Sequence, residues 1–351
     1  MKRWKFRMAC CLVLLCIQSI AWAGMSALAE ESLGETRHVD EVLESEYVTL
    51  ILSADVQIPD SALSFPIYTS DYPPVDDALW REVFFGSADA PVTDELEGAD
   101  LEDEGIARPE FHRVLSMGDI FTLYSAREAR LFVLYGSVEY LSDWHAAQEG
   151  AQAEGLETTP DEASAAAQIW IDSLRTLGWD GFQISACYAM PAAVLEEPMG
   201  AFYIVEFTRE LNGIPLAFDY PPRSGSIYSQ VRLYGDVMKI YINDQGIFRA
   251  EGYCRSYSET GTVELSVSLD DAIAILRDNM DYVNASNESS TFEVTEIGLC
   301  YRLVQQLPSS DPDVQAKAEA RPVWRFSSGI NRNQTDTFTM FVDAATGEVL
   351  P

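Results

Sequence analysis

The sequence contains little histidine, and it lacks the short motifs that usually accompany enzymatic chemistry. Its 351 residues include three histidines, His38, His112 and His145, and no two of them are four residues apart. HExxH, CxxC, GxSxG, SxxK and Walker-type patterns are absent, as is a GxGxxG that follows a strand. We therefore expect no catalytic residue, no metal site, no cofactor and no enzymatic activity.

Cysteine is also scarce. Three of the six cysteines lie within the first 16 residues, and Cys187, Cys254 and Cys300 remain in the rest of the chain. An odd number permits either one disulfide with one free thiol or three unpaired thiols. Each of the three lies in a strand-like context with no obvious basic neighbour to stabilise a thiolate. The pattern favours buried structural thiols over a disulfide framework or a nucleophile.

Basic residues are outnumbered by acidic ones. The chain has 23 Lys and Arg against 56 Asp and Glu, which gives a net charge of -33. A protein this negative repels phosphate backbones and anionic lipid, so the charge argues against nucleic acid as a partner. It suits a secreted protein that stays in solution, and it attracts basic peptides or divalent cations only weakly.

Long apolar runs are absent after the N-terminus. Four basic residues within the first seven precede the apolar run 8–23, and Ala27-Leu28-Ala29 offers a cleavage site. This order predicts a secretory signal peptide over residues 1–29. Left uncleaved, the same run would tether the protein to a membrane. In both cases we expect a secreted or extracytoplasmic protein.

The next residues predict a leader and a first domain. Residues 30–46 are acidic and polar, which favours a flexible leader. A strand pattern follows at Tyr47, a helix at 76–86, and three short strands between 111 and 135. We expect the Tyr47 strand and these three strands to form one meander with the helix packed on it. The result would be an N-terminal α+β domain over 47–140, and a linker would follow over 141–158.

An acidic loop interrupts this first domain. Asp100, Glu102 and Glu104, followed by Gly105, imitate the first half of a calcium-binding EF-hand loop. The twelfth position of such a loop should be a bidentate Glu, and here it is Phe111. The segment is therefore better interpreted as a solvated acidic surface loop.

The pattern of the remaining residues predicts two copies of one helix-and-strand unit. Thr159-Pro160-Asp161-Glu162 and Ser268-Leu269-Asp270-Asp271 are both helix starts, and they lie 109 residues apart. Each predicted helix is followed by antiparallel strands that end at a glycine-containing turn. We expect two units, over 159–260 and 261–351, each with a helix packed on an antiparallel sheet, and an α+β fold overall.

The closing pattern of the chain carries a resemblance to a known family. Trp324 and the hairpin Val342-Asp343-Ala344-Ala345-Thr346-Gly347-Glu348-Val349 resemble the end of a PepSY-type domain. Glu162-Ala163 and Asp271-Ala272 match the start of that family's helix, and Leu211-Asn212-Gly213-Ile214-Pro215 looks like a turn of secreted bacterial proteins with tandem PepSY-like modules. The layout is similar to the YycH/YycI regulators of a cell-wall sensor kinase. The resemblance implies an extracytoplasmic binding, inhibitory or regulatory module, and it carries over no catalytic residue.

Tyrosines are concentrated between residues 203 and 257, where a proline- and glycine-containing loop interrupts the strands. Tyr220, Arg223 and Tyr228 mark this loop as a possible recognition loop. The alternative interpretation is a sheet whose tyrosines lie on a half-exposed face, as their strand propensity favours.

These features together predict a non-enzymatic, exported binding or regulatory protein. It would modulate an envelope protease or sensor protein, and its partner would be an envelope protein or a peptide. The alternative is a secreted hydrolase whose active site, built around His112 or His145, has no sequence signature.

Overall fold

The chain folds mainly into β-strands. The computed structural model describes residues 33–59, 64–71, 76–90, 94–97, 112–117, 120–125, 130–135, 147–191, 200–217, 235–280, 289–305, 318–328 and 338–350. These residues form nineteen strands, three α-helices and one 3-10 helix. The strands gather into three sheets, and neighbouring strands are antiparallel except where β15 pairs with β2. The expected α+β fold of tandem helix-on-sheet units is therefore wrong.

The largest sheet has ten strands, which are consecutive along the chain from β4 to β13. Its order is β4-β5-β6-β7-β13-β12-β10-β9-β8, with β11 paired to β10. The bounds are β4 Asp94–Glu97, β5 His112–Met117, β6 Ile120–Ser125, β7 Arg130–Tyr135, β8 Gln148–Glu149, β9 Phe182–Met190, β10 Phe202–Leu211, β11 Ile214–Pro215, β12 Val237–Asn243 and β13 Gly246–Tyr253. The predicted meander of three short strands is present as β5, β6 and β7.

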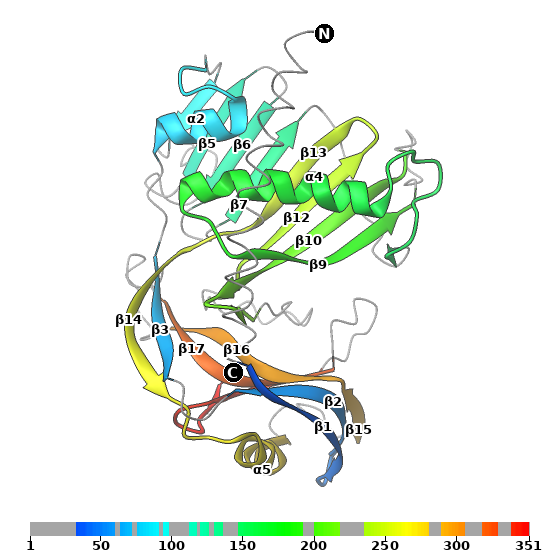
Figure 1. The fold of residues 1–351 in the computed structure, drawn as a ribbon, viewed down its shortest axis with the longest axis vertical. Helices are drawn as coiled ribbons and strands as arrows, with labels where there is room; N and C mark the ends of the chain where they lie inside the picture. Colours follow the sequence, from blue (N-terminus) through cyan, green and yellow to red (C-terminus); the bar gives the residue numbers. More distant parts are fainter. Residues whose placement is uncertain are drawn as a thin grey trace.

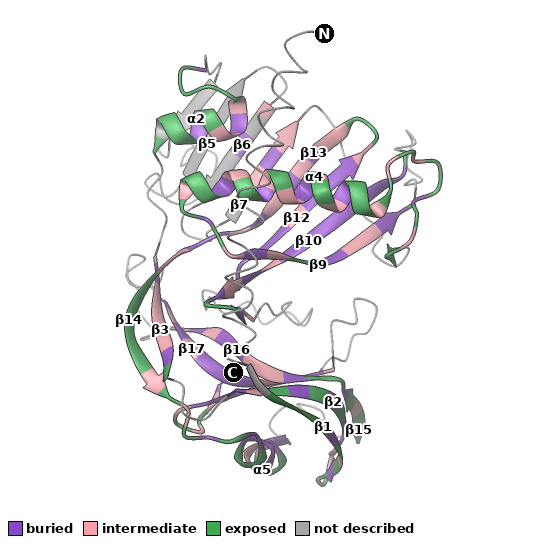
Figure 2. Cartoon of the chain, viewed as in Figure 1, coloured by how far each residue is buried: buried purple, intermediate pink, exposed green. Residues whose placement is uncertain are grey.

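Two helices cover one face of this sheet (Figure 1). They are α2 Asp77–Phe85 and α4 Pro160–Ser173, and the 3-10 helix η4 Leu174–Leu177 continues α4. Thr159 and Glu162 form the predicted capping box of α4. Figure 2 shows the buried stripe of α4 facing the sheet and its exposed stripe facing outward. Trp80 of α2 is 1 % exposed and donates from Nε1 to the Thr122 hydroxyl at 3.1 Å, so α2 is anchored on β6.

The second part of the structure contains the other two sheets. A six-stranded sheet has the order β14-β3-β17-β18-β19, with β16 paired to β17, and a three-stranded sheet has the order β1-β2-β15. The bounds are β1 Leu33–Glu44, β2 Val48–Pro59, β3 Ser64–Asp71, β14 Ser256–Glu264, β15 Ser290–Val294, β16 Glu296–Gln305, β17 Ala318–Ser327, β18 Thr339–Asp343 and β19 Val349–Leu350. Helix α5 Leu269–Asn279 begins with the predicted capping box of Ser268 and Asp271.

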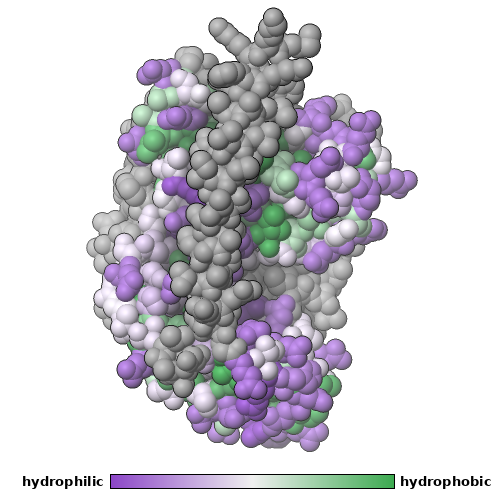
Figure 3. Space-filling view, in the orientation of Figure 1, coloured by the Kyte–Doolittle hydropathy of each residue, from purple (hydrophilic) through white to green (hydrophobic). Residues whose placement is uncertain are grey.

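We call the ten-stranded sheet with α2 and α4 the first lobe, and the other two sheets with α5 the second lobe. Each lobe has its own apolar core. The core of the second lobe joins α5 to both sheets, because Leu276, Trp324 and Leu50 belong to one buried cluster. A smaller cluster includes Leu216 beside β11 and Tyr301 of β16, so apolar contact also joins the lobes. Figure 3 shows mainly hydrophilic residues on the described surface at the α5 end of the molecule, in keeping with the net charge of -33.

The predicted flexible leader over 30–46 is instead the strand β1 from Leu33 onward. It pairs along its length with β2, and Val39 and Leu43 are 4 % and 1 % exposed in the second core. Arg37 and Glu41 lie on the same face of β1 as Val39 and Leu43. Arg37 forms an ion pair with Asp270 of α5, and Glu41 forms one with Arg277 of the same helix. The acidic residues on the outward face made β1 resemble a solvated segment. On the face toward the core, its residues are either apolar or ion-paired with α5.

The sheets also cross the expected domain boundary at residue 140. Strands β4–β7 extend the sheet of β9–β13, whereas β1, β2 and β3 join the sheets that contain β14–β19. The Tyr47 strand, described as β2, therefore lies in a different sheet from the meander into which it was expected to fit. Strand β7 forms the backbone hydrogen bonds along the free edge of β13, so the meander joins the first sheet. Strand β3 pairs with both β14 and β17, so the segment that contains β2 and β3 joins the other sheets.

Candidate functional site

Most residues singled out from the sequence lie outside the described part of the chain. These are Tyr220, Arg223 and Tyr228 of the predicted recognition loop, Asp100, Glu102 and Glu104 of the acidic loop, His145, and residues 1–29. His112 is the first residue of β5. His38 lies on β1, where its Nδ1 is 2.8 Å from Oδ1 of Asp55 on the exposed outer face of the three-stranded sheet.

The three remaining cysteines are free thiols. Cys254 and Cys300 are buried, and Cys187 is half-buried. Burial raises the pKa of Cys187, and burial together with the nearby Asp236 carboxylate raises the pKa of Cys254 well above its usual range. Cys254 lies with its Sγ 3.3 Å from Sδ of Met238. Because the thiolate is the nucleophilic form, these environments suit structural thiols.

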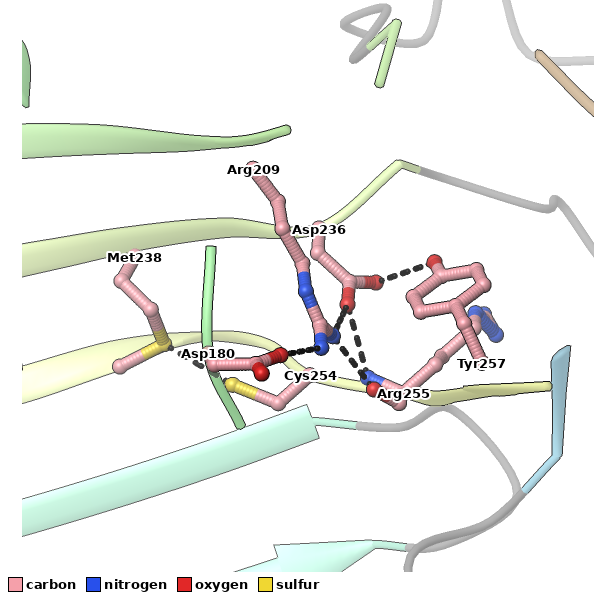
Figure 4. Close-up of polar contacts among 7 residues, drawn as sticks. All are labelled: Asp180, Arg209, Asp236, Met238, Cys254, Arg255 and Tyr257. Carbon is pink, nitrogen blue, oxygen red and sulfur yellow. Dashed lines mark hydrogen bonds and ion pairs between the residues drawn. The ribbon is translucent and has the colours of Figure 1, made fainter. Parts of the chain in front are cut away.

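The most unusual polar group of the described residues is a buried arginine where the chain passes from the first lobe to the second. Strand β13 ends at Tyr253, β14 begins at Ser256, and the crossing consists of Cys254 and Arg255. Arg209 of β10 donates from Nη1 to the Arg255 carbonyl at 2.5 Å. The same Nη1 lies 2.7 Å from Oδ2 of Asp236, the residue before β12 (Figure 4).

Asp236 connects the residues around this arginine. Its Oδ2 also accepts the backbone N–H of Arg255 at 2.8 Å, and its Oδ1 accepts the hydroxyl of Tyr257 at 3.1 Å. One buried carboxylate therefore joins β10 of the first lobe, the crossing residue Arg255 and the second residue of β14. We call Arg209, Asp236, Arg255 and Tyr257 the junction cluster.

The junction cluster is shielded from water. The side chains of Arg209 and Asp236 are 3 % and 0 % exposed, whereas Asp180, 3.3 Å from Nη2 of Arg209, is 77 % exposed. Burial disfavours the charged guanidinium, but the Asp236 carboxylate outweighs it and keeps the pKa of Arg209 above its usual value. The Arg209 guanidinium also lies over the rings of Tyr257 and Phe182, 4.8 and 5.4 Å from their centroids, which favours a desolvated cation.

Two glycines permit this close packing. A Cβ at Gly252 would lie 2.0 Å from the Val237 carbonyl oxygen, next to the crossing between the lobes. Gly181 has a φ of 77°, and a Cβ there would lie 2.5 Å from the Glu210 carbonyl oxygen. Any larger side chain at either position would force apart the strands that carry the junction cluster.

Arg255 differs from Arg209 in having no partner for its guanidinium. The residue is 3 % exposed, and its Nε is buried without a hydrogen bond. Its hydrogen bonds, to Asp236 and from Arg209, involve only its backbone atoms, and no described residue pairs with its side chain. Figure 4 shows this side chain extending along Tyr257, on the side away from Arg209 and Asp236.

A second polar network lies on the other face of the ten-stranded sheet. Glu251 accepts from the Tyr241 hydroxyl at 2.5 Å and from Nη2 of Arg249 at 2.7 Å. Burial alone would raise the pKa of Glu251, but these two hydrogen bonds and the Arg249 charge lower it overall. Glu206 and Lys239, 3.7 Å apart, lie on the neighbouring strands. Every member thus has a charged or hydroxyl partner, as expected of a network that stabilises the sheet.

The described residues contain no group of three or more His, Cys, Asp or Glu side chains arranged to hold a metal ion. No helix within the described ranges is both long and apolar enough to cross a membrane.

Comparison with known proteins yields a fold but no family. No family model matches the chain, so the PepSY-type resemblance gains no support there, and no curated protein matches it either. An uncharacterised protein from Eubacterium rectale matches with a TM-score of 0.54 and 12% identity, over 93% of this chain and 98% of that one. The two chains share a fold. YycH from Bacillus subtilis matches with a TM-score of 0.35 and 11% identity, over 81% of this chain and 54% of its own, a likeness that carries no argument.

Sequence reasoning missed the junction cluster, although one signal was present. Tyr203, Val205, Phe207 and Arg209 occupy alternate positions of β10, and the first three belong to the first core. Strand alternation therefore places Arg209 on the buried face, where a charge requires a partner. Its partner Asp236 lies 27 residues away, beyond a segment that gives no local pattern, so the pairing could not be read from the sequence.

Proposed function

We propose that this chain is an exported, non-enzymatic binding protein that regulates an envelope protein, such as a protease or a sensor, through the region where its two lobes meet. The observation that carries the proposal is the junction cluster, because it places costly buried charge where the chain passes between the lobes. An enzyme would be expected to place such charge around a reacting group. Here the hydrogen bonds of Asp236 go to the protein's own Arg209, Arg255 and Tyr257.

Buried ion pairs contribute little net stability, because desolvation offsets much of the Coulombic attraction. They do penalise any arrangement in which the partners separate. A cluster of this kind therefore suits a protein that must hold two surfaces in one orientation toward a partner. The predicted signal peptide supports export, and the charge of -33 supports a protein or peptide partner over nucleic acid.

Affinity capture tests this proposal. The full-length chain is used as bait against detergent extracts of the envelope and against the soluble fraction of the cells that produce it. We expect an envelope protein to be enriched by the wild-type bait and to be recovered less by an Asp236→Asn bait. An Arg277→Gln bait, which alters an exposed ion pair on α5, should capture as well as wild type. Equal capture by all three baits, or no enrichment from the envelope extract, would contradict the proposal.

A further inference from the structure

One of the two arginine side chains in the junction cluster has no carboxylate partner. Two arginines, Arg209 and Arg255, are each no more than 3 % exposed, and the buried Asp236 carboxylate contacts the guanidinium of Arg209 and only the backbone of Arg255. Asp236 is committed to Arg209 through a contact of 2.7 Å. The second carboxylate at the junction, Asp180, also contacts Arg209, so the Arg255 guanidinium is left with no partner among the described residues.

An uncompensated buried charge is costly, and proteins normally neutralise or pair it. Arginine side chains do not lose their proton in proteins, so pairing with an anion is the remaining way to compensate this charge. Pairing would be simple in this chain, which has 56 acidic residues against 23 basic ones. None of the described acidic side chains reaches Arg255. The missing carboxylate is therefore expected to come from another molecule.

The position of Arg255 is fixed before any such molecule binds. Its backbone N–H is held by Asp236, and its carbonyl oxygen accepts from Arg209. Fixing both sides of the residue limits the orientations of the side chain that follows. Binding at a preorganised group loses less conformational entropy than binding at a mobile surface arginine.

We propose that Arg255 is the binding residue for a carboxylate group, which docks beside Tyr257 where the chain passes between the lobes. One unpaired guanidinium group matches a carboxylate of charge -1. A phosphate monoester carries about -1.5 to -2 at neutral pH, and the remaining charge would be unpaired in a protein that is already strongly negative. The planar guanidinium also matches a carboxylate with two parallel hydrogen bonds. This inference deepens the proposed function and rests on it, because it names the ligand chemistry at the same junction.

The test measures carboxylate binding to the purified full-length chain. Binding is monitored by the shift in melting temperature and by calorimetry. Sodium acetate is compared with sodium chloride and sodium phosphate at matched ionic strength. Trialanine with a free C-terminal carboxylate is compared with its C-terminal amide. We expect acetate and the free-acid peptide to raise the melting temperature and the amide to have no effect. The tighter of the two active probes identifies the source as a free small carboxylate or a peptide end.

Three variants make the test specific. Arg255→Gln should weaken the binding of both active probes by about tenfold or more, the change that loss of ~1.4 kcal/mol produces. Arg255→Lys keeps the charge but loses the planar fork, so its binding should be intermediate. Arg277→Gln should bind as wild type does. Because Arg255 has no partner in the free protein, Arg255→Gln without ligand should unfold at a temperature no lower than that of Arg277→Gln.

Three results would overturn the inference. The first is an acetate effect that survives unchanged in Arg255→Gln. The second is a phosphate effect as large as that of acetate. The third is a ligand-free Arg255→Gln, or Arg255→Lys if the former does not fold, that is much less stable than wild type, since Arg255 would then be structural. Loss of envelope capture with intact carboxylate binding would instead contradict the proposed regulatory function alone.

Discussion

Asp236 is hydrogen-bonded to each of the other three residues of the junction cluster. It is fully buried, and it accepts hydrogen bonds from Arg209, Arg255 and Tyr257. Losing the Asp236 charge would leave the Arg209 guanidinium buried without its main counter-charge. The free-energy cost of such a buried charge is far larger than the net stability that the intact pair contributes.

Replacing Asp236 with Asn tests this role. The substitution keeps the shape of the side chain and removes its charge, so Arg209 stays buried and loses its buried counter-charge, keeping only the longer contact with exposed Asp180. We expect unfolding in urea to show a loss of about 3–5 kcal/mol relative to wild type. Asp270→Asn, which removes a carboxylate from an exposed ion pair with Arg37, is the matched control and should show no measurable loss. A loss in Asp236→Asn no larger than in the control would contradict the account.

Tyr257 makes stability sensitive to alkaline pH. Burial, with the adjacent Asp236 carboxylate, raises the pKa of Tyr257 well above the usual value near 10. In the unfolded chain the phenol loses its proton near pH 10, while in the folded chain it keeps it. The unfolded state then binds fewer protons, so the free energy of unfolding falls as pH rises above 10. Below that pH the contribution of Tyr257 is constant.

We therefore expect urea unfolding of the wild type to show declining stability from pH 10 upward. Tyr257→Phe has no phenol to ionise, so its stability should decline less steeply over the same range, although other buried tyrosines such as Tyr301 also have raised pKa values and will leave a residual slope. Identical slopes for wild type and Tyr257→Phe between pH 9 and 11 would refute this assignment.

At the scale of elements, β1 is the clearest difference between sequence and structure. Its pattern of acidic and polar residues is typical of a solvated leader, and among the β1 residues whose burial is described, two apolar ones, Val39 and Leu43, reach the core. Pairing with β2 and the ion pairs to α5 supply the rest of its stabilisation. Local composition could not reveal this, because the partners of β1 lie up to 236 residues away.

Two adjacent residues of β1 test its register. Leu43 is 1 % exposed and Val42 is 56 % exposed. We expect Leu43→Ala to destabilise the protein by about 2–5 kcal/mol, as large-to-small changes in a core do. Val42→Ala should leave the free energy of unfolding nearly unchanged. Chemical denaturation of both variants provides the comparison, and equally small effects would mean that β1 does not dock as described.

The elements with strong local signals were predicted well. Capping residues located the starts of α4 and α5, and Gly178 and Gly347 have the positive φ values expected of a helix end and a hairpin turn. The short strands from β5 to β7 follow from their apolar and β-branched residues. What the sequence did not reveal was which strands pair, since pairing depends on contacts distant along the chain. The fold class was mispredicted for this reason.

At the scale of the whole molecule, two lobes meet through apolar contact and through the junction cluster. Leu216 and Tyr301 form a parallel bridge, and Ala217 donates its backbone N–H to the Tyr301 carbonyl at 2.7 Å. The junction cluster adds charge to this contact. Removing the Asp236 charge would leave the exposed Asp180 as the one carboxylate that the described residues bring to buried Arg209, and water must then enter to solvate the guanidinium. We infer that the two lobes would lose their single fixed orientation.

The most direct test of this central claim is the distance between the lobes, measured by pulsed electron resonance. Spin labels carried by non-canonical amino acids replace Val42 on β1 and Ile169 on α4, which are 56 % and 70 % exposed. The wild-type background should give one narrow distance distribution, and so should Arg277→Gln. In Asp236→Asn we expect a broadened or shifted distribution. A distribution in Asp236→Asn as narrow as in wild type, at the same distance, would contradict it.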